Sequence, residues 1–184
     1  MANHCYNYAS IEGTEQMLDL FEKRLAEATK NNEALFHPTF YQVLGLEAMD
    51  GDVYNDFGSR WFDTLWERHS PTTGLLSGDS AWSPVSEFLR KLSEVYSFDI
   101  ESTYEEGGDN FGGWFDCTNG EVTTDVTTSY YAFRYTEEGE YFMQSLIEDA
   151  NEGYWESADE LDKDLLEAMT EQDKQDLIDA INKI

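Results

Sequence analysis

The start of the chain changes from a strand-like to a helical hydrophobic period. Residues 4–11 alternate between apolar and polar side chains and stop at Gly13, as a strand does. Thr14 can cap a helix, and apolar residues recur from there at helical spacing to about Asn31. These apolar positions are Met17, Leu18, Phe21, Leu25 and Ala28. The pattern predicts one strand followed by one amphipathic helix.

The stretch 33–59 has no sustained hydrophobic period. Gly and Pro residues interrupt it, at Pro38, Gly45, Gly51 and Gly58. We predict a long loop here, with a short helix near 39–44. Loops of this length inside a domain are often functional.

Two strands and a second helix are expected next. Residues 59–68 and 74–82 have strand composition and are separated by a turn at 70–73. Ser83 is placed to cap the following helix, and Pro84 to take its first position. The apolar stripe of this helix is formed by Val85, Phe88, Leu89, Leu92 and Tyr96.

Three further strands are predicted at about 97–105, 111–118 and 121–128. Asn119-Gly120 separates the last two, and this dipeptide favours a two-residue hairpin. The order strand, helix, strand, strand, helix, strand, with an added hairpin, predicts an α+β fold. This is the split β-α-β arrangement of a ferredoxin-like antiparallel sheet with two helices on one face.

The end of the chain has a helical pattern. We expect helices at 137–152, 158–169 and 171–183. Thr170 and Asp173 have the spacing of a capping box that would open the last helix. The sequence therefore predicts a C-terminal helical appendage.

With 184 residues, the chain has room for one main domain. Its content of 40% hydrophobic and 15% aromatic residues is sufficient for a core. We predict a ferredoxin-like α+β domain at residues 1–135 and an acidic helical appendage at 136–184.

The charge is the most unusual feature of the composition. The chain has 39 Asp and Glu residues against 11 Lys and Arg residues, a formal net charge of −28. Residues 1–92 hold 14 acidic and 7 basic side chains, net −7, and residues 93–184 hold 25 and 4, net −21. Such a field repels nucleic acid and anionic membranes and attracts basic partners. Adaptation to high salt, the alternative explanation, predicts an even spread of acids, so the asymmetry favours a partner.

No apolar run approaches the roughly 20 residues of a membrane span. The start of the chain has neither the basic region nor the apolar stretch of a signal peptide. We therefore expect a cytoplasmic protein with no membrane partner. Cys5 and Cys117 are predicted to be buried thiols rather than a disulfide.

Three parts of the sequence carry motifs of a known family. They are Met1 to Asn7 with Ile11-Glu12-Gly13, then Ala81-Trp82-Ser83-Pro84 with Leu92-Ser93-Glu94-Val95-Tyr96, and then Gly112-Gly113-Trp114-Phe115 with Asn119-Gly120-Glu121-Val122. These segments are similar to the start, the central segment and the closing hairpin of the Api-type ferredoxin-like proteins found on bacteriophages and mobile plasmids. The resemblance covers residues 1–128.

The chain departs from that family's pattern at His4, where Trp is usual, and at Val85, where a second Pro is common. The resemblance implies the ferredoxin-like fold and a phage or plasmid setting. The family has no agreed activity, so the resemblance implies no site residue.

The sequence gives little support for catalysis. The three histidines lie in unrelated segments, and there is neither a Gly-rich phosphate loop nor an HExxH motif. Asp50, Asp52 and Asp56 suggest calcium, but the EF-hand pattern fails. Its fifth, sixth and twelfth positions are Tyr54, Asn55 and Trp61. We expect no enzyme, no cofactor and no metal.

The acids of the second half follow a strand pattern. In the strand at 97–105, acidic residues alternate with apolar ones, and the pattern repeats at 121–126. Same-face neighbours on a strand lie roughly 6.5–7 Å apart, close to the separation of successive phosphates in a nucleic acid. One face of the sheet is expected to be rich in carboxylates that imitate a phosphate backbone. The alternative is a solvated acidic face without a partner.

The aromatic residues are mostly expected in the core, including the five tryptophans. The segment Phe111 to Phe115 is a candidate for a partly exposed aromatic tip, although Trp114 and Phe115 point to opposite faces and at least one of them is predicted to be buried. The residues predicted to bind the partner are Asp99, Glu101, Glu105, Glu106, Asp109, Phe111, Glu121, Asp125, Glu137, Glu138 and Glu140.

The leading hypothesis is a DNA mimic: a phage- or plasmid-encoded binding protein that inhibits a host DNA- or RNA-binding defence complex, either a restriction or a CRISPR effector. Its partner would be a basic nucleic-acid-binding protein, without direct contact to nucleic acid. The alternative is a virion or assembly protein that docks on a basic component. The sequence leaves open whether the protein is a homodimer.

Overall fold

The computed structural model describes residues 4–30, 34–48 and 56–183. The chain forms two compact units. Unit 1 comprises residues 1–108 and 113–126, and unit 2 comprises residues 109–112 and 127–184. Each unit has its own core, so we describe them separately.

In the described residues, the strands form one seven-stranded sheet in the order β2-β3-β4-β1-β5-β6-β7, which belongs to unit 1 except for the start of β6 and the end of β7. The pairs for which a register is established are antiparallel. The strands are β1 His4–Glu12, β2 Ala34–Leu35, β3 Phe62–Arg68, β4 Thr73–Ala81, β5 Asp99–Glu106, β6 Phe111–Thr118 and β7 Glu121–Thr128. The four central strands β3-β4-β1-β5 have the predicted ferredoxin-like order, and the predicted hairpin adds β6 and β7.

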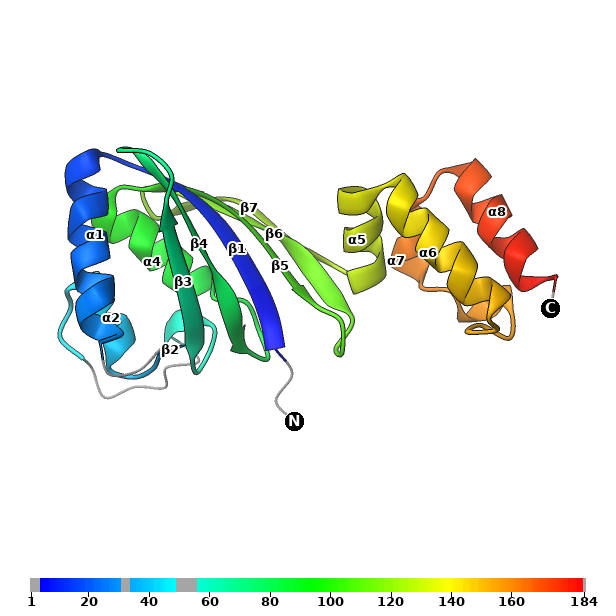
Figure 1. The fold of residues 1–184 in the computed structure, drawn as a ribbon, viewed down its shortest axis with the longest axis horizontal. Helices are drawn as coiled ribbons and strands as arrows, with labels where there is room; N and C mark the ends of the chain where they lie inside the picture. The colour runs from blue at the N-terminus through cyan, green and yellow to red at the C-terminus, as the bar shows by residue number, and fades with distance from the viewer. Residues whose placement is uncertain (1–3, 31–33, 49–55, 184) are drawn as a thin grey trace. The chain divides into compact units, whose positions relative to one another are not determined.

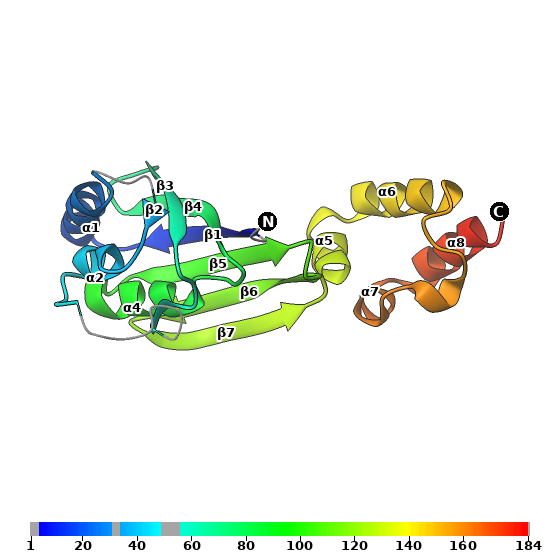
Figure 2. The ribbon, with the colours of Figure 1, turned by 90° about the horizontal axis from the view of Figure 1, so that it is seen from below.

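Helices lie on one face of this sheet, as Figures 1 and 2 show. They are α1 Glu15–Ala28, α2 Thr39–Leu44 and α4 Ser86–Tyr96. Thr14 caps α1 as predicted, because its side chain accepts a hydrogen bond from the backbone N–H of Met17. The predicted short helix near 39–44 is α2, whereas the short strand β2 was not predicted.

The core of unit 1 lies between the sheet and these helices and is largely aromatic. The ring of Phe21 on α1 meets Trp66, Tyr96 and Phe98 edge to face, with centroids 4.9, 5.8 and 5.9 Å away. Such edge-to-face pairs stabilise beyond the area that they bury. The core therefore joins α1, β3 and the end of α4.

Asn7 connects β1 to β4 and to the start of α4. It is buried, and its amide nitrogen donates to the Cys5 carbonyl at 2.9 Å and to the Ser80 hydroxyl at 2.8 Å. Its amide oxygen accepts a hydrogen bond from the Val85 N–H at 3.1 Å. One side chain thus satisfies the buried polar groups where three elements meet.

The predicted start of the second helix is wrong by a few residues. Helix α4 begins at Ser86, and Val85 rather than Ser83 is its N-cap. The Ser83 hydroxyl instead donates to the carbonyl of Gly58, and Asn7 binds the Val85 N–H. Contacts far away in the sequence therefore replaced the local cap.

The hairpin between β6 and β7 is the predicted two-residue turn. Asn119 and Gly120 both have positive φ, 50° and 82°. These values suit a type I′ turn, in which both central residues need the left-handed region. Thr118 and Glu121 flank the turn, so they pair directly and share a face.

Unit 2 is helical. Its elements are α5 Tyr130–Glu138, α6 Glu140–Asn151, a short 3-10 helix at Ala158–Glu160, α7 Lys163–Ala168 and α8 Glu171–Ile181. The prediction of one helix at 137–152 is wrong, because Gly139 ends α5 with φ 57° and ψ −130°. The predicted capping of α8 is confirmed: the Asp173 N–H donates to the Thr170 hydroxyl at 3.2 Å.

The boundary between the two units differs from the predicted one. Residues 127–135 belong to unit 2, whereas the prediction placed them in the ferredoxin-like domain. Helix α5 carries Tyr131 and Tyr135, which pack against the core of unit 2. The buried residues of that core are Met143, Leu146, Ala150, Trp155, Leu161, Leu165, Met169, Leu177, Ala180 and Ile181.

Candidate functional site

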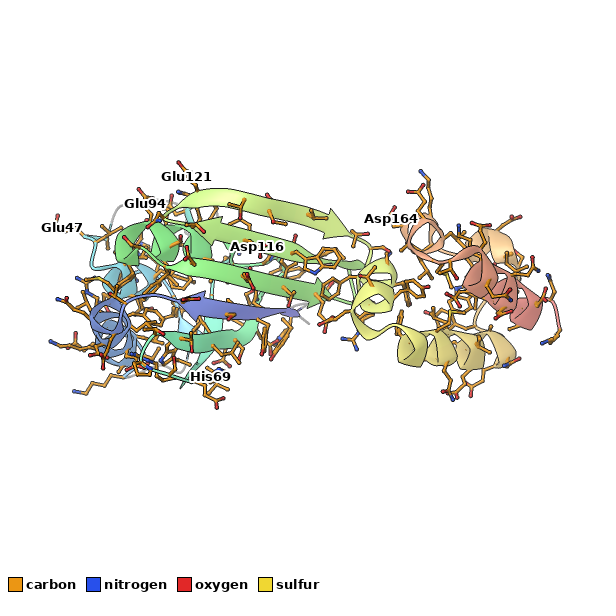
Figure 3. All side chains as sticks on the ribbon, turned by 90° about the horizontal axis from the view of Figure 1, so that it is seen from above. Glu47, His69, Glu94, Asp116, Glu121 and Asp164 are labelled. Atoms are coloured by element: carbon orange, nitrogen blue, oxygen red, sulfur yellow. The ribbon has the colours of Figure 1, made fainter. Side chains whose placement is uncertain are left out.

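The face of the sheet opposite α1, α2 and α4 is the candidate site, and we call it the open face. Figure 3 looks onto it, with Asp116 and Glu121 labelled. Strand β1 alternates strictly between exposed and buried residues. Its buried set, Cys5, Asn7, Ala9 and Ile11, points toward the helices. Its exposed set, His4, Tyr6, Tyr8, Ser10 and Glu12, forms the middle of the open face.

The register across β3, β4, β1 and β5 arranges the open face in rows, because directly paired residues in antiparallel strands point to the same side. One row reads Asp63, Asp79, Tyr6, Glu105. The next reads Leu65, Ser77, Tyr8, Thr103, and the third reads Glu67, Leu75, Ser10, Glu101. A neutral row thus lies between two acidic rows, each roughly 6.5–7 Å from the next.

Strands β6 and β7 extend the open face. Phe115 and Cys117 are buried, and the Cys117 thiol lies 3.8 Å from the Leu89 carbonyl of α4. Strand alternation therefore puts Asp116 on the open face. Thr118 and Glu121 pair across the hairpin. Glu121 and every second residue after it on β7 therefore also lie on the open face.

The open face carries many carboxylates. They come from Glu12, Asp63, Glu67, Asp79, Asp99, Glu101, Glu105, Asp116, Glu121 and Asp125. Among the strands of the described sheet, Arg68 is the sole Lys or Arg residue. Its guanidinium lies 3.2 Å from Glu22 and 3.4 Å from Asp19, both on α1, and so faces away from the open face.

On the open face, two cross-strand pairs each consist of two acidic residues. Asp63 is the cross-strand partner of Asp79, and Glu12 that of Asp99. Directly opposed like charges destabilise a sheet. The His4 imidazole Nδ1 lies 3.4 Å from Asp79 Oδ2, so the first pair has a neighbouring group that can carry positive charge.

The structure brings five of the predicted site residues together. Asp99, Glu101, Glu105, Glu121 and Asp125 all lie on the open face, and Glu105 is half-buried there. The carboxylates of β1, β3, β4 and β6 were missed. The alternation of β1 and β3 was the signal that could have indicated Glu12, Asp63 and Glu67.

Glu106 does not join this surface. Like Ser102 and Tyr104, it lies on the side of β5 that faces the helices, and only 5% of it is exposed. Its Oε1 accepts a hydrogen bond from the Gly108 N–H at 3.0 Å. The prediction that Glu106 is part of an exposed acidic surface is therefore wrong.

The remaining predicted site residues belong to unit 2. Asp109 is exposed in the turn before β6, and Phe111 is half-buried. Glu137 is exposed on α5, with its Oε2 3.8 Å from Arg134 Nη1. Glu138 and Glu140 are in helical segments, and their side chains lie outside the part of the chain that the structure describes.

The aromatic predictions are confirmed in part. Phe115 is buried and Trp114 is half-buried, so at least one of the two lies in the core as predicted. Trp155 is also buried. Trp82 is not a core residue, because 51% of it is exposed and its φ of 69° turns the chain after β4. The tyrosines of β1 were not singled out from the sequence.

Cys5 and Cys117 are buried free thiols, as predicted. Burial raises the pKa of the Cys5 thiol to about 12. Within the residues that the structure describes, no three His, Cys, Asp or Glu side chains are grouped closely enough to hold a metal ion. The suggested calcium ligands Asp50 and Asp52 lie outside those residues, and the Asp56 carboxylate accepts a hydrogen bond from the Tyr41 hydroxyl at 2.6 Å.

Unit 2 contains a cavity of about 610 Å³. Met143, Ile147 and Tyr135 line it, together with Asp173. The Asp173 carboxylate accepts hydrogen bonds from the Tyr135 and Thr170 hydroxyls at 2.6 and 2.7 Å. The hydrogen bonds from Tyr135 and then Thr170 hold the pKa of Asp173 below its usual value. The carboxylate in this cavity therefore stays ionised and helps to start α8.

Comparison with known proteins confirms the resemblance predicted from the sequence. Residues 55–144 match the family model of the ferredoxin-like domain in Api92-like proteins. Among solved structures, the chain is similar to the crystal structure of a protein api92 from Yersinia pseudotuberculosis. The identity is 10% and the TM-score 0.45, over 71% of this chain and 98% of that one. No curated protein matches the chain.

The α+β class and the ferredoxin-like domain are thus established for unit 1, and the family is described by its fold alone. Among the helices of the described residues, none is both long enough and apolar enough to cross a bilayer. The chemistry of the open face is therefore the main guide to function.

Proposed function

We propose that this protein is an acidic inhibitor, encoded by a phage or a mobile plasmid, that presents its open face in place of a nucleic-acid backbone. It would occupy the basic DNA or RNA groove of a host defence complex, a restriction or a CRISPR effector. The observation that carries the proposal is the gathering of carboxylates on one sheet face that has no Lys or Arg among its strand residues.

The spacing of the acids supports this role. Asp99 and Glu101 are same-face neighbours on β5, roughly 6.5–7 Å apart. The acidic rows that contain Glu105 and Glu101 are separated by one neutral row, so a basic groove would meet negative charge repeatedly along the strands. A groove that binds phosphates at regular intervals presents Lys and Arg to such a pattern.

The opposed like charges favour a binding role over a purely structural one. Asp63 beside Asp79 and Glu12 beside Asp99 cost stability in the isolated protein. A basic partner would relieve both repulsions on binding. Selection for folding alone does not explain why both pairs are acidic.

The contacts in this proposal are many and individually weak. An exposed charge pair is worth about 1 kcal/mol or less at physiological salt, so affinity has to come from the sum of the acidic rows. Each basic contact also depends on salt, since the Debye length shortens as salt rises. The proposal therefore predicts steep salt dependence.

Competition with DNA tests the proposal. A panel of purified restriction and CRISPR effectors is loaded with labelled DNA, and the protein is titrated in at about 50, 150 and 500 mM salt while DNA release is followed by anisotropy. We expect displacement from at least one effector at low salt and its loss at high salt. A failure to displace DNA from any effector at low salt contradicts the proposal.

The same face could instead dock on a basic component of a virus particle. That second function predicts recovery of the protein from purified particles at a fixed copy number. It also predicts no displacement of DNA from the effectors. The two outcomes together therefore separate the alternatives.

A further inference from the structure

Two tyrosines of β1 stand exposed in the middle of the open face. Tyr6 is 45% exposed and Tyr8 is 46% exposed. As same-face neighbours on one strand, their rings start roughly 6.5–7 Å apart. Neither hydroxyl makes a hydrogen bond within the residues that the structure describes. The opposite side of β1 packs in the core of unit 1. The two rings take no part in that packing and are therefore available to bind a partner.

Carboxylates surround the two rings. Asp79 on β4 and Glu105 on β5 are the direct cross-strand partners of Tyr6. Tyr8 lies opposite Thr103, with Glu101 as a diagonal neighbour. Directly opposite Cβ atoms are roughly 4.5–5.5 Å apart and diagonal ones roughly 7–8 Å, within reach of long side chains. Each ring therefore lies close to a carboxylate.

This combination suits one side chain. The planar guanidinium of arginine stacks on an aromatic ring and can pair with a carboxylate at its edge at the same time. The ammonium group of lysine pairs with the carboxylate as a compact, strongly hydrated charge and lacks the flat surface for stacking. A carboxylate surface without rings can favour arginine only through paired hydrogen bonds, whereas this strip adds a stacking surface that lysine cannot use.

We infer that the strip formed by Tyr6 and Tyr8, with Asp79, Glu101 and Glu105 beside it, is a docking surface for an arginine-rich segment of the partner protein. The inference rests on the proposed function and specifies which basic side chains the open face selects. In an extended segment, alternate residues are also roughly 6.5–7 Å apart, so two arginines separated by one residue match the two rings.

Other occupants fit the open face less well. A second copy of the chain would bring the same carboxylates against these, and an anionic membrane or a nucleic acid would be repelled in the same way. A purely apolar partner would strip water from the carboxylates of Glu101 and Asp79 without replacing it. Charge complementarity therefore selects a basic polypeptide, and the two exposed rings favour arginine within it.

Peptide binding tests the inference. Fluorescein-labelled nona-arginine and nona-lysine are titrated with the full-length protein at about 50 and 150 mM salt, and Kd is measured by anisotropy. Three variants are compared with wild type: Tyr6→Phe/Tyr8→Phe, Tyr6→Leu/Tyr8→Leu and Leu65→Ala. The first keeps the rings, the second keeps only apolar bulk, and the third removes an exposed side chain that has no ring from the same face.

For wild type we expect tighter binding of nona-arginine than of nona-lysine. Two stacked guanidinium groups at exposed sites correspond to a preference of about 5- to 30-fold. The Phe variant and Leu65→Ala should keep the preference. The Leu variant should lose most of this preference, because only pairing with the carboxylates remains to favour arginine. Circular dichroism and thermal melting confirm the fold of each variant, which exposed strand positions should tolerate.

Equal binding of the two peptides by wild type would overturn the inference, as would an unchanged arginine preference in the folded Leu variant. If both peptides still bind with steep salt dependence when either result is found, only the inference of arginine selection fails. The proposed function of the acidic open face then still stands. If neither peptide binds wild type at low salt, the proposed function and the inference both fail.

Discussion

Ser129 and Asp162 join the starts of two helices through a hydrogen bond between their side chains. The Ser129 hydroxyl donates to Asp162 Oδ1 at 2.7 Å. Ser129 is also the N-cap of α5, where it accepts from the Ala132 N–H, and Asp162 is the N-cap of α7, where it accepts from the Leu165 N–H at 2.9 Å. One pair of side chains thus fixes two helix starts in unit 2.

Removing this carboxylate should destabilise unit 2. Asp162→Ala loses the cap of α7 and leaves the Ser129 hydroxyl without its acceptor, a cost of about 1–3 kcal/mol. Urea unfolding followed by far-UV circular dichroism measures it. The control is Asp159→Ala, an exposed acid of the same unit, which should stay within about 0.5 kcal/mol of wild type. Equal stability of the two variants would show that the link does not support the fold.

The same carboxylate should make the stability of unit 2 depend on pH. Partial burial raises the pKa of Asp162, but hydrogen bonds from Ser129, the Leu165 N–H and Asn110 outweigh burial and hold the pKa below the ordinary 3.8. A lowered pKa in the folded state contributes stability above the unfolded pKa. That contribution is lost as pH falls through the folded pKa.

The difference in unfolding free energy between wild type and Asp162→Asn should therefore be constant from pH 7 to about pH 5 and shrink below about pH 4. Wild type and variant carry the same other acids. The effect of protonating those acids on stability therefore cancels in the difference between the two proteins. Urea series at graded pH give the difference. A difference that grows on acidification contradicts the assigned direction of the shift.

Asn7 should be needed for stability although it lies on the reverse side of the open face. Asn7→Ala leaves the buried Val85 N–H without the Asn7 acceptor and removes the amide nitrogen that donates to the Cys5 carbonyl and the Ser80 hydroxyl. We expect a loss of about 1–3 kcal/mol in the unfolding free energy of unit 1. Ser10→Ala, on the exposed side of the same strand, should change it by less than about 0.5 kcal/mol. Chemical denaturation of both variants decides the point.

Binding should depend on many carboxylates together. Glu101→Gln alone should change partner affinity by about fivefold at most, since one exposed charge contact is worth about 1 kcal/mol or less. Reversing Asp99, Glu101, Glu105, Glu121 and Asp125 to Lys should abolish binding with the fold intact. The measurement is displacement of DNA from the effector, with circular dichroism to verify folding.

The control for the five reversals changes the same number of exposed acids to Lys elsewhere in the chain. They are Glu27, Glu47, Glu152, Glu156 and Asp159. Because the net charge changes equally, any difference between the two variants reports position on the open face. If one Asp or Glu to amide change eliminated all activity while the five reversals left binding untouched, the mimicry hypothesis would be wrong.

The sequence determined the elements whose signals are local. Strands β6 and β7 lie where the pattern placed them, because Asn119-Gly120 tolerates the positive φ values that a two-residue hairpin needs. The helix after Thr14 likewise follows from a cap and a 3.6-residue period. The alternation of β5 was sufficient to put Asp99 and Glu101 on the same face.

The tertiary structure decided the neighbours across the sheet. Placing β1 between β4 and β5 sets Tyr6 between Asp79 and Glu105, residues that are distant in the sequence. It also opposes Glu12 to Asp99. No local period encodes such pairs, because strand order and register follow from burying the whole hydrophobic face at once.

Long-range contacts also overrode local signals at single positions. Ser83 has the residue type of a cap, yet its hydroxyl binds Gly58 while Asn7 takes the Val85 N–H. Glu106 is acidic but buried, since the register of β5 turns it toward the helices, where the Gly108 N–H can bind it. Composition and periodicity therefore determined the fold class and the acidity. Strand pairing, which depends on contacts across the whole core, determined which acids and aromatics share the open face.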